Sequence, residues 1–284
     1  MEIQAYAKIN LTLDVGRLRP DDYHEVTMVM QTISLCDDLT LAFAGSGPPR
    51  LLCDDPALPA DGTNLAQRAA AAFSAATGRD LSGLEIRLTK RIPAMAGLAG
   101  GSADGAAVLR ALNELTGTGL TIPQLQAIGL TIGSDVPFCV AGGAALAEGR
   151  GEVLTAIPGL PPCGIILIQP SFQVSTGVLY RALDGGVLTE RPGTAGMLQA
   201  LEQKNLPRVC EKLSNVFEQV LPPDEQGIVA EVRSALLAQG ALGARMTGTG
   251  SVVYGIFAST AEAEAAAKAL AGRYPTVLTA VPME

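Results

Sequence analysis

The sequence predicts an α+β protein of two domains. In the first half, strands that alternate polar and apolar residues are followed by helix-forming runs. In the second half, the elements follow the order strand, helices, strand, strand, helix, strand, which is typical of an α+β layer. A proline-rich stretch at residues 158–162 separates the halves. We therefore predict an N-terminal domain over residues 1–157 and a C-terminal domain over residues 163–284.

Composition and charge limit the function. Hydrophobic residues make up 48% of the 284 residues and charged residues 17%, which is ample material for a core. The formal net charge is −8 and there is no basic block, which disfavours binding to nucleic acid or to an anionic membrane. No apolar run reaches the length of a membrane span, and residues 1–4 do not begin a signal peptide. We therefore expect a cytoplasmic protein.

The cysteine and histidine content excludes several kinds of site. The five cysteines are scattered and form no C-x-x-C pair, so we expect neither structural zinc nor a disulfide framework. His24 is the only histidine, which excludes every mechanism that needs two. No G-x-S-x-G elbow accompanies it. We assign no metal ligand.

The first predicted strand covers residues 3–14, where polar and apolar residues alternate without a break. Lys8 and Asn10 project from the same face of this strand. If that face lines a cleft, the two side chains lie side by side in it. The alternative is an ordinary solvated strand face.

A loop is predicted over residues 16–25, which contain Gly16 and Pro20. Tyr23 and His24 on this loop can stack on and hydrogen-bond a flat ligand, or they can anchor the loop. Further predicted elements of the first half are strands over 26–35 and 39–44, a surface excursion over 45–62, a helix over 64–77, a strand over 84–89, a helix over 104–115, a short helix from 121, and a hairpin of 142–148 with 152–157.

The stretch from Pro93 to Asp104 joins a strand to a helix and is dense in glycine. The first N–H groups of a helix have no intrahelical partner and the helix dipole is positive there, so this geometry forms an anion site. Gly97, Gly100 and Gly101 can adopt positive φ and let a phosphate approach the main chain. Ser102 can cap the helix or bind a phosphate oxygen. The loop fits neither G-x-x-x-x-G-K-[ST] nor G-x-G-x-x-G, so a small-residue turn is the alternative.

Asp135 follows Gly133-Ser134 at a predicted helix or turn boundary. Its position suits an N-cap, because a capping carboxylate accepts hydrogen bonds from the first turn. A catalytic role is equally compatible with the local sequence. The predicted elements of the second half are a strand over 164–169, helices over 175–183, 194–203, 208–220 and 224–238, strands over 244–247 and 252–257, a helix over 260–271 and a strand over 276–281.

Three blocks in this order resemble the GHMP small-molecule kinases. They are Lys8-Ile9-Asn10-Leu11, the loop from Pro93 to Ser102 with its P-x-x-x-G-L-x-G-G-S pattern, and Met246-Thr247-Gly248-Thr249-Gly250. Two more segments, Arg19-Pro20…Tyr23-His24 and Gly133-Ser134-Asp135-Val136-Pro137-Phe138, are similar to the branch of this family whose substrate carries cytidine diphosphate. The resemblance spans nearly the whole chain.

Four positions depart from the family pattern. Asp22 stands where the family usually has glycine, which leaves open the path of the loop that carries Tyr23. Ala99 replaces a common glycine and narrows the backbone conformations allowed there. Thr247 and Thr249 stand where serine is common, which preserves a hydroxyl.

The resemblance implies a fold and an activity. The fold would be an S5-like N-terminal domain followed by a ferredoxin-like C-terminal domain. The activity would be ATP-dependent phosphorylation of the 2-hydroxyl of a methylerythritol unit carried on cytidine diphosphate, in non-mevalonate isoprenoid biosynthesis. The alternatives are a GHMP kinase for mevalonate, homoserine or a sugar, and a non-catalytic nucleotide-binding module. Mg²⁺ would arrive with ATP, and no protein ligand is assigned to it.

The resemblance also implies roles for individual residues. Asp135 would accept or orient the hydroxyl proton, and Lys8 would neutralise charge near Asp135 and the transferred group. The residues implied for substrate binding are Asn10, Tyr23, His24, Tyr180, Thr247 and Gly248, with Tyr23, His24 and Tyr180 at the cytosine. The residues implied for ATP binding are Asn64, Pro93, Ala94, Met95, Ala96, Gly97, Leu98, Ala99, Gly100, Gly101, Ser102 and Ala103.

Overall fold

The structure is a computed structural model that describes residues 1–284. Its chain forms two compact units, each built from several stretches of sequence. Unit 1 comprises Met1–Ala7, Leu35–Ala94 and Ala99–Gly142, and unit 2 comprises Lys8–Ser34, Met95–Leu98 and Gly143–Glu284. The sequential division at residues 158–162 stays a prediction. Every helix is too short or too polar to span a bilayer.

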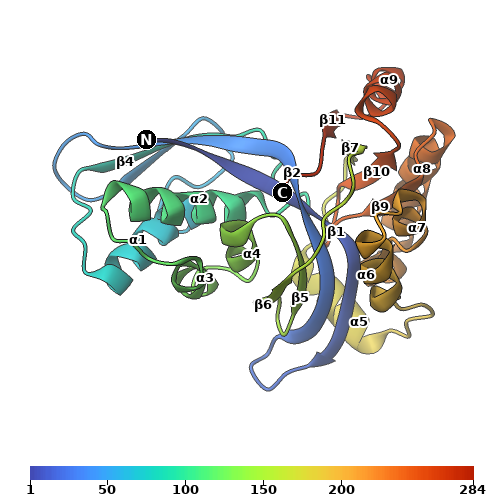
Figure 1. Ribbon diagram of the computed structural model, residues 1–284, viewed down its shortest axis with the longest axis horizontal. Coiled ribbons are helices and arrows are strands. Elements are labelled where there is room, and N and C mark those ends of the chain that lie inside the picture. Colours follow the sequence, from blue (N-terminus) through green and yellow to red (C-terminus); the bar gives the residue numbers. More distant parts are fainter. The chain divides into compact units, whose positions relative to one another are not determined.

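Unit 1 packs helices beside a small group of strands (Figure 1). Strand β4 (Leu84–Thr89) pairs in parallel with β3 (Arg50–Cys53) and antiparallel with the second half of β2 (His24–Phe43). The helices are α1 (Leu65–Thr77), α2 (Gly100–Leu115), α3 (Ile122–Leu130) and α4 (Val136–Ala141). Helix α2 packs against α1 and α4, and its alanines let the helices approach closely because they add little volume.

Helix α1 confirms the predicted helix over residues 64–77. Its N-cap residue is Asn64, whose side-chain oxygen accepts a hydrogen bond from the N–H of Ala66. Gly78 ends the helix with a φ of 70°, and its N–H donates to the carbonyl of Ser74.

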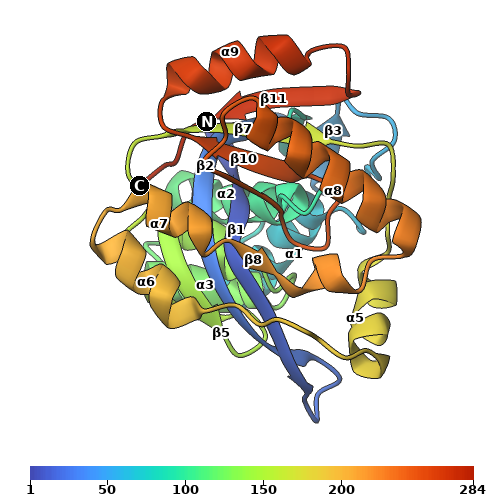
Figure 2. The same ribbon diagram turned by 90° about the vertical axis from the view of Figure 1, so that its right-hand side faces the viewer.

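The C-terminal part of unit 2 is a four-stranded antiparallel sheet in the order β11-β7-β10-β9 (Figure 2). The strands are β7 (Gly164–Gln169), β9 (Gly243–Met246), β10 (Val253–Phe257) and β11 (Thr276–Ala280). Helices α8 (Pro223–Ala238) and α9 (Thr260–Leu270) pack against these strands. In chain order the sheet reads fourth, first, third, second, which is the ferredoxin-like arrangement that the family resemblance implies.

The rest of unit 2 is built on the two long N-terminal strands. Strand β1 (Glu2–Leu18) pairs in parallel with the short β8 (Ser214–Asn215), and the first half of β2 pairs with β5 (Ala144–Glu148). The remaining elements are β6 (Val153–Ala156), α5 (Thr176–Gly185), α6 (Thr194–Glu202), α7 (Leu206–Glu211) and a 3₁₀ turn over Val216–Gln219. Strands β5 and β6 confirm the predicted hairpin.

Strands β1 and β2 differ from the prediction in length and burial. Strand β1 is buried on both faces from Ala7 to Leu13, so the alternative of a solvated polar face is wrong there. The predicted loop over residues 16–25 is shorter in the structure, because β1 extends to Leu18 and β2 begins at His24, with a turn at residues 20–22 between them. The two strands predicted over 26–35 and 39–44 are one continuous strand, because the carboxylate of Asp37 is satisfied by hydrogen bonds from the backbone of Arg91 and Ile92.

Two other predicted segments also differ. The surface excursion over residues 45–62 contains β3. The helix predicted over residues 208–220 is divided into α7, β8 and the 3₁₀ turn. Its interruption falls at Asn215, whose side chain accepts from the N–H of Phe217 and whose backbone pairs with β1.

Candidate active site

The glycine-rich loop runs directly into the first turn of α2. The helix begins at Gly100, four residues before the predicted start, and Ala99 is its N-cap residue with a φ of 59°. Gly100 and Gly101 are therefore helical, and the prediction of positive φ for these two glycines is wrong, whereas Gly97 has a φ of 76°. Alanine has no side-chain acceptor, so Ala99 does not cap the N–H groups of the first turn. Free N–H groups at a helix N-terminus are able to bind an anion.

Tight packing favours glycine at the first two positions of α2. A Cβ atom on Gly100 would lie 3.0 Å from Cγ2 of Ile92, and one on Gly101 would lie 3.3 Å from Cδ1 of Leu65. A side chain at either position would therefore require these neighbouring side chains to shift.

Ser102 and the segment before Asp135 lie together in unit 1. A Cβ atom on Gly133 would be 3.8 Å from Oγ of Ser102. Asp135 occupies the N-cap position of α4, but its side chain makes no capping hydrogen bond. Side-chain capping by Asp135 is therefore not observed, and its catalytic role stays a prediction.

A buried ion cluster lies at the base of this helix start. The Lys90 ammonium bonds to Asp37 and, at 2.7 Å, to Oδ2 of Asp104. A Cβ atom on Gly100 would lie 3.5 Å from Lys90 Nζ, which places the ammonium against the first turn of α2. Burial raises the pKa of Asp104 to about 7, although the charge of Lys90 opposes this. Sequence reasoning missed these three residues, because their partners are far apart in the chain.

The Asn64 side chain is hydrogen-bonded within unit 1. Its amide nitrogen donates to the carbonyl of Pro59 and its oxygen caps α1, so both ends of the side chain are engaged. A role for Asn64 in ATP binding stays a prediction. In the loop itself, Met95 is exposed, whereas Ala96, Leu98 and Ala103 are buried.

Lys8 and Asn10 meet in unit 2. Their residues are only 4% and 1% exposed, so the solvated-face alternative is wrong. The Lys8 ammonium donates to Oδ1 of Asn10 at 2.7 Å and to the carbonyl of Gly97 at 2.9 Å. The strand thus presents a buried cation, and two neutral oxygens fix the direction of its N–H bonds.

The C-terminal glycine motif completes this cluster. Oδ1 of Asn10 accepts from the N–H of Gly248 at 3.1 Å, and the N–H of Asn10 donates to Oγ1 of Thr247 at 3.0 Å. A Cβ atom on Gly97 would lie 2.1 Å from the carbonyl oxygen of Thr247. Only glycine fits at position 97, because its φ is positive and the facing backbone occupies the space of any side chain. Lys8, Asn10, Gly97, Thr247 and Gly248 therefore form one hydrogen-bonded group.

A second predicted group lies around His24 in unit 2. The ring centroids of His24 and Tyr180 are 4.9 Å apart, and Tyr180 meets Phe217 edge-on at 5.1 Å. Nε2 of His24 lies 2.7 Å from Oδ1 of Asp184. Phe217 and Asp184 were not predicted. Both come from elements whose proximity to His24 depends on tertiary structure.

Tyr23 contacts a cation, whereas Tyr180 contacts other rings. The guanidinium of Arg150 lies over the Tyr23 ring, 4.7 Å from its centroid, and the Tyr23 residue is 48% exposed. Asp22, which replaces the usual glycine, has a φ of 60°. It therefore adopts the left-handed conformation that glycine takes readily and aspartate tolerates.

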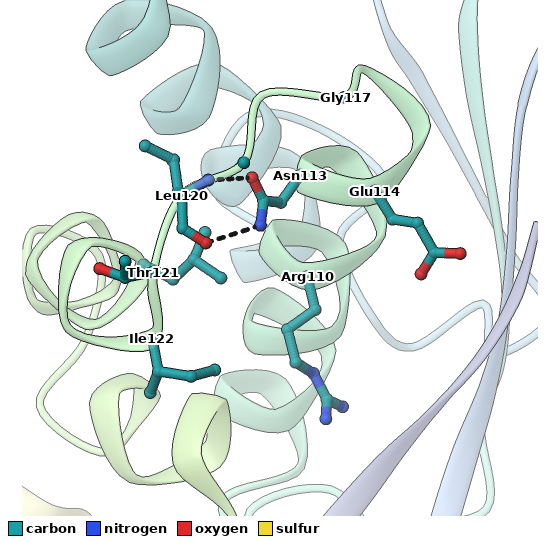
Figure 3. Close-up of a pocket in the computed structure, with 9 residues that line it drawn as sticks. Arg110, Asn113, Glu114, Gly117, Leu120, Thr121 and Ile122 are labelled. Carbon is teal, nitrogen blue, oxygen red and sulfur yellow. Dashed lines mark hydrogen bonds between the residues drawn. The ribbon is translucent and has the colours of Figure 1, made fainter.

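The structure also contains a pocket that none of the predicted residues lines. It has a volume of about 610 Å³ and lies in unit 1 between the end of α2 and the start of α3 (Figure 3). At one side Asn113 bonds to both the N–H and the carbonyl of Leu120. No group of three or more His, Cys, Asp or Glu side chains is arranged to hold a metal ion.

Comparison with known proteins assigns the family. The N-terminal domain of GHMP kinases matches residues 64–143, and the C-terminal domain of GHMP kinases matches residues 197–276. The chain belongs to the GHMP kinase family. A GHMP kinase fold explains the ferredoxin-like sheet of unit 2 and the strand–glycine loop–helix sequence that precedes α2.

Several relatives of this GHMP kinase are similar over almost their full length. A protein of Geobacter metallireducens named 4-diphosphocytidyl-2-C-methyl-D-erythritol kinase is 42% identical over 270 residues, covering 95% of this chain and 94% of the relative. A protein of Gloeobacter violaceus with the same name is 44% identical over 278 residues, covering 96% and 90%. The crystal structure of a 4-(cytidine 5'-diphospho)-2C-methyl-D-erythritol kinase is similar with a TM-score of 0.82, 34% identity and full coverage of both chains.

Proposed function

We propose that this GHMP kinase transfers the γ-phosphoryl group of ATP to the 2-hydroxyl of 4-diphosphocytidyl-2-C-methyl-D-erythritol, a step of non-mevalonate isoprenoid biosynthesis. The observation that carries this proposal is the similarity to relatives of that name, at 42% and 44% identity over nearly the whole chain. The hydrogen-bonded group around Lys8 and the aromatic group around His24 support it, because such a kinase needs both a cation and a base-binding surface.

Phosphoryl transfer depends mainly on positioning and on neutralising spread charge. In the proposed reaction, the 2-hydroxyl oxygen attacks the γ-phosphorus, the bond to the β–γ bridging oxygen breaks, and ADP leaves. Asp135 accepts or orients the hydroxyl proton, the role that the Gly133-Ser134-Asp135 segment has by its resemblance to the family. The Lys8 ammonium stabilises charge on the transferred group, held in direction by Asn10 and Gly97.

The glycine-rich loop is proposed to bind the phosphates of ATP. The uncapped first turn of α2 at Gly100–Ser102 offers N–H groups and a positive dipole end. N–H donors bind phosphate oxygens and cannot ligate a cation. Mg²⁺ would therefore be held by the ATP phosphates and water, as this ion commonly is.

The acceptor is proposed to be recognised through its cytosine. The His24 and Tyr180 rings contact each other at a tilt of 34°, so a base could stack on the ring of Tyr180 while His24 adds a hydrogen-bonding edge. Tyr23 and Asn10 complete the proposed substrate-binding set together with Thr247 and Gly248.

The test is an acceptor panel with ATP and Mg²⁺, read by ADP release and by ³¹P NMR of the product. We expect turnover with 4-diphosphocytidyl-2-C-methyl-D-erythritol and a new phosphomonoester at O2. Methylerythritol 4-phosphate, which lacks the cytidine, serves as the matched acceptor. Preferential turnover of mevalonate, homoserine or a sugar would replace the proposal with another activity of the same family.

A further inference from the structure

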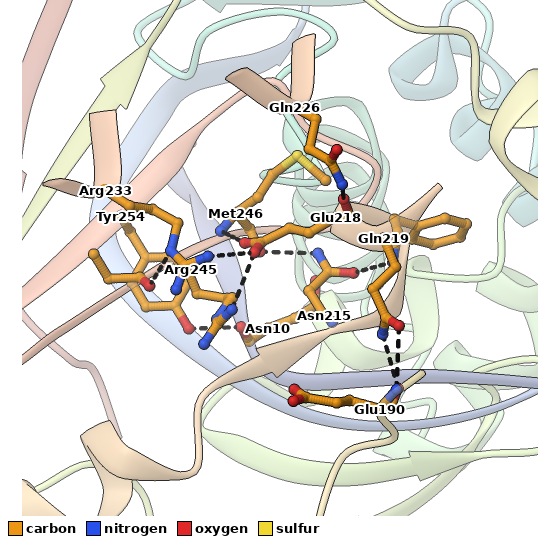
Figure 4. Close-up of polar contacts among 12 residues, drawn as sticks. Asn10, Glu190, Asn215, Glu218, Gln219, Gln226, Arg233, Arg245, Met246 and Tyr254 are labelled. Atoms are coloured by element: carbon orange, nitrogen blue, oxygen red, sulfur yellow. Dashed lines mark hydrogen bonds and ion pairs between the residues drawn. The ribbon is translucent and has the colours of Figure 1, made fainter. Parts of the chain in front are cut away.

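Asn215 makes a buried clamp on the C-terminal glycine motif (Figure 4). Its Nδ2 donates to the carbonyl of Met246 at 2.9 Å and to the carbonyl of Gly248 at 2.8 Å. Its Oδ1 accepts from the N–H of Phe217 at 3.0 Å. The residue is only 3% exposed, so water could not replace these hydrogen bonds. Losing them would therefore leave buried carbonyl groups unpaired, which lowers the free energy of unfolding.

The clamp is continuous with Lys8. Asn215 holds the carbonyl of Gly248, and the N–H of the same Gly248 donates to Oδ1 of Asn10. That oxygen also accepts from the Lys8 ammonium. One chain of hydrogen bonds therefore runs from Asn215 through Gly248 and Asn10 to Lys8, and all four residues lie in unit 2.

Glu218 holds the same segment from a second point. Its Oε1 accepts from the N–H of Met246 at 2.7 Å. Glu218 therefore binds the N–H of Met246, and Asn215 binds its carbonyl. Its Oε2 pairs with Arg233 and Arg245, each at 3.0 Å. Because the Glu218 residue is buried, this pairing keeps its charge compensated and its position fixed. The C-terminal glycine motif is thus held by hydrogen bonds to two buried residues, Asn215 and Glu218.

We propose that Asn215 is a positioning residue for phosphoryl transfer, which acts through Gly248 and Asn10 on the direction of the Lys8 ammonium. The inference rests on the proposed function, in which Lys8 touches the transferred group. Asparagine suits this position because one terminal nitrogen offers two donors, which bring two carbonyls of the same turn together. Gly248 has a φ of 57°, and the clamp holds the backbone orientation that directs its N–H toward Asn10.

The experiment compares Asn215→Ala with Asn113→Ala. Asn113 makes a comparable clamp, with two hydrogen bonds to Leu120, but it lies at the pocket of Figure 3 and touches none of the proposed site residues. For Asn215→Ala we expect kcat to fall about 10- to 100-fold, while the KM for ATP stays within about twofold. For Asn113→Ala we expect a lower Tm and an unchanged kcat.

Each outcome decides the question. If Asn215→Ala keeps kcat within about twofold, or if both variants lose the same factor in kcat, Asn215 is only structural and the inference fails. Asn215→Asp has the same size and places acceptors against the two carbonyls, so it carries the test if the alanine variant does not fold. Failure of the wild-type protein to turn over the cytidine-bearing acceptor would instead overturn the proposed function.

Discussion

Nε2 of His24 lies 2.7 Å from Oδ1 of Asp184, and this contact fixes which ring nitrogen of the histidine is turned away from the carboxylate. With the Nε2 proton donated to Asp184, Nδ1 of a neutral His24 is left as an acceptor. Nδ1 is thus the ring nitrogen that we propose recognises the base. Asp184 sits on α5, near Tyr180, so one helix orders both parts of the surface proposed for cytosine.

Replacing Asp184 tests this relationship. Asp184→Ala removes the acceptor of the Nε2 proton, and we expect the KM for the cytidine-bearing acceptor to rise about 3- to 10-fold. The Asp184 side chain is 49% exposed, which keeps the effect moderate. The KM for ATP serves as the internal control and should not change. Equal KM values for both substrates in the variant and the wild type would remove Asp184 from the specificity surface.

Tyr180 should matter for the cytidine-bearing acceptor and not for ATP. Stacking of a base on an aromatic ring is worth about 1–3 kcal/mol, so Tyr180→Ala should raise the acceptor KM about 5- to 150-fold. Tyr180→Phe keeps the ring and is the matched control. Steady-state kinetics with the cytidine-bearing acceptor measure both variants. A normal KM in Tyr180→Ala would contradict stacking at this position.

Asp135→Asn separates chemistry from structure. Asparagine has the same size and shape as aspartate and suits the N-cap position of α4, so we expect the Tm to remain close to that of the wild type. Loss of a general base lowers the rate by about 10²- to 10⁴-fold, and kcat should fall within that range. Activity assays and thermal unfolding on the same preparation check both expectations. A near-normal kcat would show that Asp135 neither accepts nor orients the proton.

Two glycine-to-alanine variants in the phosphate loop should differ in severity. At Gly97 the new Cβ would lie 2.1 Å from the backbone oxygen of Thr247 at a positive φ, so we expect loss of ATP binding and a lower Tm. At Gly100 the Cβ would lie 3.0 Å from a side-chain methyl of Ile92, which can shift. Titration calorimetry with ATP ranks the two variants. Gly97→Ala binding ATP as tightly as Gly100→Ala would contradict the backbone contact.

The Lys90–Asp37–Asp104 cluster should leave a signature in the pH dependence of stability. Burial raises the pKa of Asp104 to about 7 from an unfolded value of 3.8, so between these values the folded state keeps a proton that the unfolded chain releases. The contribution of this group to the free energy of unfolding therefore falls as pH rises from 4 to 7. Asp104→Asn cannot titrate and should lose less stability over this window. Parallel Tm curves for variant and wild type would contradict the shift.

Local signals in the sequence were sufficient where the chemistry is local. Helix α1 begins after Asn64 and ends at Gly78, as predicted. A capping side chain and a left-handed glycine each bond to backbone groups only a few residues away, so both signals can be found in the local sequence. The pairing of Lys8 with Asn10 follows from their spacing along one strand. Neither feature depends on distant segments, so the capping residues and the alternation of side chains along a strand are enough to predict them.

Long-range contacts account for what the sequence did not reveal. Asp37 looks like a strand break, but it continues β2 because the peptide N–H groups of residues 91 and 92 satisfy its carboxylate. Asn215 lies inside a helical pattern, but its side chain binds a turn more than thirty residues away in the sequence. Propensity has no information about such partners, so both residues were missed.

At the contact between Gly97 and the Thr247–Gly248 segment, two backbone segments pack directly against each other with no side chain between them. Both glycines have a positive φ, and a Cβ atom on either would lie within 3 Å of the facing backbone, so the junction depends on glycine at both positions. Positions 97 and 248 should therefore be left unchanged in any mutant library designed to alter the acceptor of the enzyme, because a side chain at either one would separate the two backbone segments.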